Sequence, residues 1–167
     1  MAKKVTGNQL RAAVKLLETK LQAAIHVFED SLYAFSDEEK DPIKAMDKIK
    51  EIQKNISEVQ ELQAIYNLLV TVPVGTETMT LCRAVKLIGM AGQSASLWRS
   101  AMPKKRDRYH DPEKTRRVDE ETSSLTLSME HVAEWLYTAQ GYANLLQTAI
   151  AQGNSTEVPL DVPEGLL

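Results

Sequence analysis

The sequence is poor in features that would mark a secreted or membrane-spanning protein. It has a single cysteine in 167 residues, so no internal disulfide can form, and we interpret Cys82 as a small buried hydrophobe in a reducing cytoplasm. No window approaches the roughly 18 uninterrupted apolar residues of a membrane span, and the basic start of the chain lacks the apolar stretch of a secretory leader. We therefore expect a cytoplasmic protein that does not enter a membrane.

Catalytic motifs are missing as well. The chain has no Gly-x-Ser-x-Gly, Walker A or dinucleotide-binding glycine pattern. His26, His110 and His131 are isolated in the sequence. His131 and Glu134 are three positions apart on an expected helix, but a metal site in a helical bundle needs such pairs from several helices, so we interpret them as a solvated face. We predict a protein that is not an enzyme and that uses no metal or cofactor.

Aromatic residues make up only 5% of the chain, and aliphatic and long polar side chains fill its periodic stretches. This composition favours helices packed by aliphatic side chains. Apolar residues at steps of three and four predict one helix over 8–35 and another over 42–69. Asp41 as N-cap and Pro42 as first residue would begin the second helix. The short polar break at 36–40 predicts an antiparallel hairpin.

Two more helices are predicted after the hairpin. Thr76 or Thr78 would cap the third helix, which runs to Ala101, and a regular apolar spacing predicts the fourth from Leu125 until Gly153. The sequence therefore predicts an all-α fold in which a long antiparallel helical hairpin and two further helices form a bundle.

We expect a single helical domain over 1–158 and a flexible C-terminal tail over 159–167, which has no periodicity. Residues 70–74 and 122–127 alternate in a way that predicts a small two-stranded β element joining the two connections. Glycines at positions 89 and 92 weaken the third helix, so we expect another helix to approach closely there, within the chain or between subunits.

The strongest local feature is a concentration of positive charge. Residues 104–117 carry a net charge of +4 in a chain whose overall charge is -3, so the other 153 residues carry -7. One interpretation is a solvated loop whose cations offset acidic neighbours. The other is a site for an anion, because arginine offers paired donors to phosphate. The candidate ligand-binding residues are Arg99, Lys105, Arg106, Arg108, Tyr109, Lys114, Arg116 and Arg117.

Aromatic residues near this segment suggest what kind of anion would bind. Tyr109 together with Trp98 would stack on a base, which favours a nucleotide over a plain anion. The alternative is that Trp98 and Trp135 are core aromatics on the apolar stripes of their helices. A long nucleic acid is disfavoured because the acidic remainder of the chain repels a polyanion.

We also expect a homo-oligomer, because the third helix is too short to cover the apolar stripe of the long hairpin. Two functions stay open at this stage. The first is a non-catalytic oligomeric protein that binds a small anionic, nucleotide-like ligand, as a phage protein that sequesters an immune signal would. The second is a structural or interaction scaffold with no small-molecule ligand.

The order of elements resembles that of a known family. The shared features are a long helical hairpin, Gly75, the run Thr78–Leu81, the pair Arg108–Tyr109, Lys114, and a last helix ending over 150–157. Over about residues 8–158 the chain is similar to the uncharacterised helical septicolysin family, whose members look bacterial or phage-borne. The family's polar Asn-x-Thr-Asn run reads differently here, over 67–71. Its name implies a pore-forming toxin, whereas this chain shows no spanning segment and no glycine-rich insertion hairpin.

Overall fold

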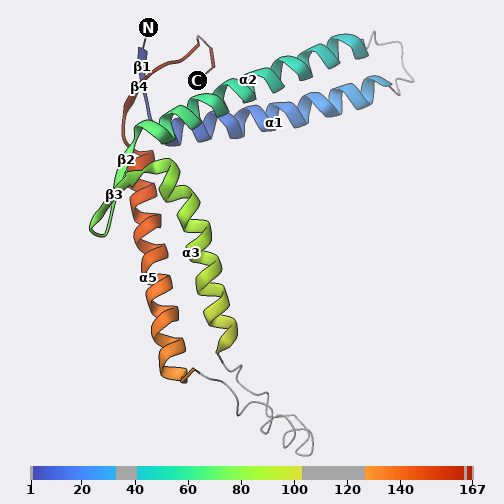
Figure 1. The fold of residues 1–167 in the computed structure, drawn as a ribbon. Coiled ribbons are helices and arrows are strands. Elements are labelled where there is room, and N and C mark those ends of the chain that lie inside the picture. Colours follow the sequence, from blue (N-terminus) through green and yellow to red (C-terminus); the bar gives the residue numbers. More distant parts are fainter. Residues whose placement is uncertain (1, 33–40, 103–126, 164, 167) are drawn as a thin grey trace, which may run out of the picture. The chain divides into compact units, whose positions relative to one another are not determined.

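The structure, a computed structural model, describes residues 2–32, 41–102, 127–163 and 165–166. It is predominantly helical, which confirms the predicted all-α class (Figure 1). The helices are α1 (Gly7–Leu32), α2 (Pro42–Leu69), α3 (Leu81–Ala101) and α5 (Met129–Asn154). The strands are β1 (Ala2–Val5), β2 (Thr71–Val74), β3 (Glu77–Thr80) and β4 (Val158–Asp161). Within the described ranges, no helix combines the length and the apolar character needed to cross a membrane.

The chain divides into two compact units, one of which extends beyond residue 158, the end of the expected helical domain. The hairpin unit comprises Met1–Ala84 and Ala149–Leu167, and the helix-pair unit comprises Val85–Thr148. In the hairpin unit, β4 pairs antiparallel with β1, so that Ala2 lies opposite Asp161. The segment 159–167 was expected to be a flexible tail, but its first three residues belong to β4.

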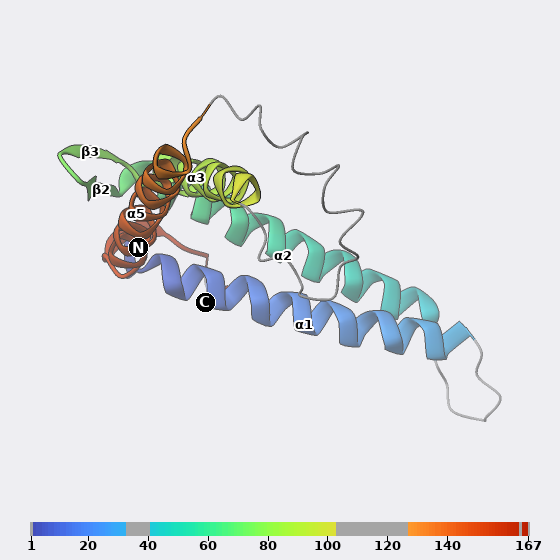
Figure 2. The same ribbon diagram turned by 90° about the horizontal axis from the view of Figure 1, so that it is seen from below.

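Helices α1 and α2 run antiparallel and lie side by side, as the sequence predicts (Figures 1 and 2). Their apolar stripes meet in a core of aliphatic and aromatic side chains. Its buried members are Ala24, Ile49 and Ile52, and Leu21, Ile25, Phe28 and Ile56 pack against them. The three-and-four spacing that predicted the two helices thus also identifies the surfaces that bury each other.

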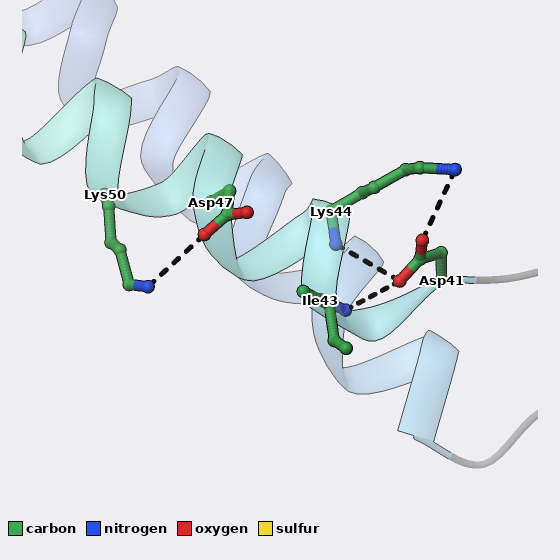
Figure 3. Close-up of polar contacts among 5 residues, drawn as sticks. All are labelled: Asp41, Ile43, Lys44, Asp47 and Lys50. Atoms are coloured by element: carbon green, nitrogen blue, oxygen red, sulfur yellow. Dashed lines mark hydrogen bonds and ion pairs between the residues drawn. The ribbon is translucent and has the colours of Figure 1, made fainter.

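The start of α2 shows why the helix begins where it does. Asp41 is the N-cap, and its carboxylate accepts hydrogen bonds from the backbone N–H groups of Ile43, at 3.0 Å, and Lys44, at 3.2 Å (Figure 3). Pro42 follows at the first helical position, where a missing N–H costs nothing. The hydrogen bond from the Lys44 backbone is the main cause that lowers the pKa of Asp41 from its ordinary value of 3.8.

The short strands refine the predicted β element. β2 pairs antiparallel with β3, its immediate neighbour in sequence, whereas the expected pairing of 70–74 with 122–127 stays a prediction. The loop between β2 and β3 is short and contains Gly75 at a φ of +61°, so closing it costs far less entropy than joining distant segments. Residues 122–126 lie outside the described ranges.

The helix α3 therefore begins later than expected. Thr78 lies in β3 opposite Pro73, so the predicted cap is wrong, and Thr80 takes the role instead. The Oγ1 atom of Thr80 accepts a hydrogen bond of 3.3 Å from the backbone N–H of Arg83. The Cys82 side chain, in the first turn of α3, is half-buried.

A close-packed junction connects α2 to the end of α5 within the hairpin unit. Tyr66 is completely buried, and its hydroxyl lies 2.6 Å from the carbonyl oxygen of Gly153 and 2.7 Å from that of Thr156. A Cβ atom added at Gly7 would lie 2.5 Å from Oδ1 of Asn154 and 2.8 Å from Cε1 of Tyr66. We call these five residues the Tyr66 junction. Glycine is required at position 7 because no side chain fits there.

The glycines of α3 are in a different situation. A Cβ atom added at Gly89 or Gly92 would meet no described atom within 4 Å. The close approach of another helix expected at these positions is therefore absent from the described part of the chain. A contact between subunits at this place stays a prediction.

Candidate functional site

Of the eight candidate ligand-binding residues, the structure describes Arg99. The other seven lie outside the described residues, and these are Lys105, Arg106, Arg108, Tyr109, Lys114, Arg116 and Arg117. The site can therefore be built from Arg99 and from what surrounds it in the helix-pair unit.

Arg99 occupies the last turn of α3. A cation is favourable there because the last carbonyl groups of a helix carry partial negative charge. The side chain is exposed, and it makes no ion pair in the part of the chain that the structure describes. No described carboxylate therefore neutralises its guanidinium group.

A cleft of about 420 Å³ lies beside Arg99 between α3 and α5. Small residues create the space, because Gly92, Ala95 and Ala143 leave the two helix flanks without bulky side chains. We call this hollow the Arg99 cleft. Its lining consists of Gly92, Ala95, Ser96 and Arg99 from α3 and of Gln140, Ala143 and Asn144 from α5.

The chemistry of the Arg99 cleft suits a negatively charged, hydrogen-bonding ligand. Arg99 supplies a permanent positive charge with paired donors, and Ser96 supplies a hydroxyl group. Gln140 and Asn144 add amide groups that donate and accept. None of the described residues of this lining carries a carboxylate, so no described group within the cleft neutralises the guanidinium group or repels an anion.

Trp98, which was expected to stack on a base at this site, instead contacts another tryptophan. The rings of Trp98 and Trp135 stack on each other, with centroids 5.7 Å apart and planes inclined by 29°. Neither residue lines the Arg99 cleft. Trp98 is half-buried but Trp135 is 53% exposed, so the second tryptophan is not the core aromatic that its stripe suggested.

Sequence reasoning missed the contribution of α5 to the cleft. Gln140 and Asn144 are four positions apart and therefore share one side of a helix, but this spacing also fits an ordinary solvated face. Ala143 falls on the apolar spacing that predicts this helix, and it lies toward α3. The signal that could have identified the site is the combination of small residues on both helices with polar residues beside them.

Two larger hollows follow α1 in the hairpin unit, with volumes of about 520 and 460 Å³. Both include Leu17 and Lys20, and the larger one also includes Lys48 and Glu51. The larger hollow has two lysines and one glutamate, and the smaller one has Lys3 and Lys20 and no carboxylate, so the lining of each is positively charged and otherwise mainly apolar. The Arg99 cleft differs from both in the uncharged hydrogen-bonding groups of Ser96, Gln140 and Asn144 beside its cation, and for this reason we favour it as the site for a nucleotide-like anion.

The pair His131 and Glu134 is exposed on α5. The Nδ1 atom of His131 lies 2.8 Å from the hydroxyl oxygen of Ser128, the residue before the helix. Among the described residues, no three side chains of the metal-binding types come together. The contact with Ser128 accounts for the position of the imidazole ring without a ligand.

Comparison with protein families finds no family model that matches the chain, and no curated protein matches it either. A similar solved structure is that of a functionally unknown conserved protein from Corynebacterium diphtheriae. Its TM-score is 0.62 at 11% sequence identity, covering 93% of this chain and 99% of that chain. At this identity the similarity shows a shared fold and carries no information about function. The resemblance to the septicolysin family stays a prediction.

Proposed function

We propose that this protein is a non-catalytic, oligomeric helical protein that binds a small anionic, nucleotide-like ligand, with the Arg99 cleft as part of the binding site. The observation that carries the proposal is the guanidinium group of Arg99, which has no ion-pair partner among the described residues and lies in a cleft whose other described polar groups are uncharged. Sequestration of a signalling nucleotide by a phage protein would need no more than such a site.

The cleft residues divide naturally between the two parts of a nucleotide. Arg99 and Ser96 would donate hydrogen bonds to phosphate oxygens, since arginine presents two parallel donors to a phosphate. The amides of Gln140 and Asn144 can each donate and accept, as hydrogen bonding to the edge of a base requires. A volume of about 420 Å³ lies within the range of small-molecule sites.

The basic segment 104–117 adds charge to this proposal. It begins five residues after Arg99, and a chain of that length spans at most about 18 Å. We expect its cations to raise the local positive potential and so to speed the capture of an anion.

The test fills the cleft without unfolding the protein. Gly92→Leu places a large side chain where no described atom lies within 4 Å, and it also replaces glycine by a strong helix former. We expect this variant to keep its circular dichroism spectrum and to lose at least tenfold in affinity for the nucleotide that the wild type binds. The measurement is calorimetric titration with a panel of nucleoside triphosphates and cyclic dinucleotides.

Gly141→Leu is the matched control, because Gly141 lies in α5, outside the cleft lining, and is equally free of neighbours. It should bind like the wild type. Arg99→Glu should weaken binding about 10- to 100-fold, the usual loss of a charged hydrogen bond. A wild type that binds no member of the panel, or a Gly92→Leu variant with full affinity, would refute the proposal.

A scaffold function is the second candidate, favoured by large apolar side chains exposed on the hairpin. Leu16 is 57% exposed, and Val27 is 61% exposed. A scaffold would assemble without a ligand. Native mass spectrometry of protein purified from cells separates the two candidates, because it reports the number of subunits and the mass of any retained ligand together.

A further inference from the structure

The helix-pair unit has an apolar face that the Arg99 cleft does not use. Large side chains on both helices point to solvent there, with exposed fractions between 39% and 70%. We call it the tryptophan face, because the stacked pair of Trp98 and Trp135 lies within it. Its other members are Met90 and Leu97 of α3 and Tyr142 and Leu145 of α5.

Helical geometry places this face on the side opposite the cleft. Successive residues turn by about 100° around an α-helix, so residues two positions apart lie about 160° from each other. Leu97 precedes Arg99 by two positions, and Met90 precedes Gly92 by two. On α5, Tyr142 precedes Asn144 in the same way. Both helices therefore direct cleft residues to one side and large apolar residues to the other.

The centre of the tryptophan face is free of charge, and Lys86, four positions before Met90 on the same side of α3, lies at its edge. From Leu87 to Ala101 the only charged residue of α3 is Arg99, which lies on the cleft side. From Trp135 to Asn154, α5 has no charged residue at all. Interface cores are typically depleted in charge and enriched in aromatic residues and methionine, and this face has that composition.

A second copy of the chain is the occupant that these observations favour. The net charge of -3 works against self-association over most surfaces, but two faces with charge-free centres approach without repulsion there. The segment 103–126 is a poor alternative occupant, because 13 of its 24 residues are charged. A face shared by two antiparallel helices can also pair with itself about a two-fold axis, which gives a bundle of four helices.

The size of the face fits a weak dimer. From the exposed fractions, its large side chains present on the order of 500 Å² per copy, at the upper end of what a monomer usually exposes. Two copies would bury about 1,000 Å² together, near the lower limit of a specific protein–protein interface. We propose that the tryptophan face is a homodimer interface that leaves the two Arg99 clefts directed outward. This inference specifies the self-association that the proposed function includes.

The proposal can be tested without a substitution. Trp98 and Trp135 are the only two tryptophans of the chain and both belong to the tryptophan face, so tryptophan emission reports on that face alone. Wild-type protein is diluted from about 100 μM to nanomolar concentration while its mass is followed by light scattering and mass photometry. We expect the mass to fall from twice 18.7 kDa to 18.7 kDa, with a red shift of the tryptophan emission over the same concentrations. A monomer at 100 μM, or a dimer that dissociates without any shift in emission, would overturn the proposal.

Substitutions then identify the interface. Leu97→Glu and Tyr142→Glu each place a charge in the face on a different helix, and each should raise the dissociation constant of the dimer at least 100-fold. Leu16→Glu, at an exposed leucine in the hairpin unit, is the matched control and should leave the dimer intact. If all three variants dimerise like the wild type, the interface lies elsewhere.

Ligand binding separates this proposal from the preceding one. Because the face and the cleft lie on opposite sides of the helices, monomeric Leu97→Glu should bind a nucleotide with wild-type affinity per chain. Failure of nucleotide binding in the wild type leaves the interface test unaffected, and an intact dimer in Leu97→Glu leaves the cleft test unaffected.

Discussion

The Tyr66 junction and the helix-pair unit use the same residue type in opposite ways. In the junction, a Cβ atom at Gly153 would lie 2.7 Å from Cγ1 of Val72, so glycine is there because packing leaves no room. In the helix-pair unit, Gly92 and Gly141 have no described neighbour within 4 Å of such an atom. The difference indicates that the first region is tightly packed around its glycine, whereas the second has open surface at its glycines.

We expect the largest effect on the free energy of unfolding at Tyr66, in the tightly packed junction. Tyr66→Ala empties a completely buried site at the centre of the junction, and we expect the free energy of unfolding to fall by about 3–5 kcal/mol. Tyr66→Phe keeps the ring but removes the hydroxyl, so the carbonyl oxygen of Thr156 loses that donor, at a cost of about 1–3 kcal/mol. Urea unfolding followed by circular dichroism measures both. A loss below 1 kcal/mol for Tyr66→Ala would mean that the junction is not the stable region.

A pair of glycine substitutions in one helix sharpens the contrast. Gly153→Ala forces a methyl group against the buried side chains of Val72 and Leu81, and we expect a loss of about 1–3 kcal/mol in unfolding free energy. Gly141→Ala, in the open part of α5, should gain up to about 1 kcal/mol because alanine is the better helix former. Opposite shifts in melting temperature would confirm the contrast. Shifts of the same sign in both variants would contradict it.

The smallest expected effect concerns the helix caps, which differ in charge. In the hairpin unit α2 is capped by the carboxylate of Asp41, whereas in the helix-pair unit the hydroxyl of Ser128 accepts the hydrogen bond at the start of α5. Because folding lowers the pKa of Asp41 below its ordinary 3.8, the stability that its charge contributes is complete above that pH. It is lost progressively as the pH falls from about 3.8 through the lowered folded-state value.

Asp41→Asn tests this, because asparagine keeps a capping oxygen but does not titrate. Wild type should exceed the variant slightly in melting temperature at pH 6, and the difference should shrink toward zero between about pH 4 and pH 2. A difference that stays constant over this range would show that the charge of Asp41 has no part in the stability of the cap.

The helical part of the fold could be predicted from the sequence because its signals are local. Three-and-four spacing identified α1, α2 and α5, and the Asp-Pro pair at positions 41 and 42 gave the start of α2 correctly. The antiparallel hairpin followed from the length of the connection. Each of these inferences uses residues within a few turns of each other, so no knowledge of distant contacts was needed.

What the sequence did not predict depends on distant contacts. β1 and β4 are short and have no distinctive pattern, yet Ala2 and Asp161 become neighbours. The candidate site also depends on contacts between residues that are distant in the sequence. Arg99 could be identified as an available cation, but Gln140 and Asn144 resemble any polar residues on a helix surface until α3 and α5 are packed together. The seven other candidate residues lie outside the described ranges and stay predictions.

The hydroxyl of Tyr66, which bonds to carbonyl groups near residue 153, also has a consequence for the order of events during synthesis. Residues 1–84 leave the ribosome long before residues 149–161, which complete the core around Tyr66 and pair with β1. The α1–α2 hairpin can therefore form early, but its buried tyrosine and first strand wait for almost the whole chain. Contacts of such large sequence separation form late and slowly, so until then the nascent hairpin exposes apolar surface that chaperones would recognise.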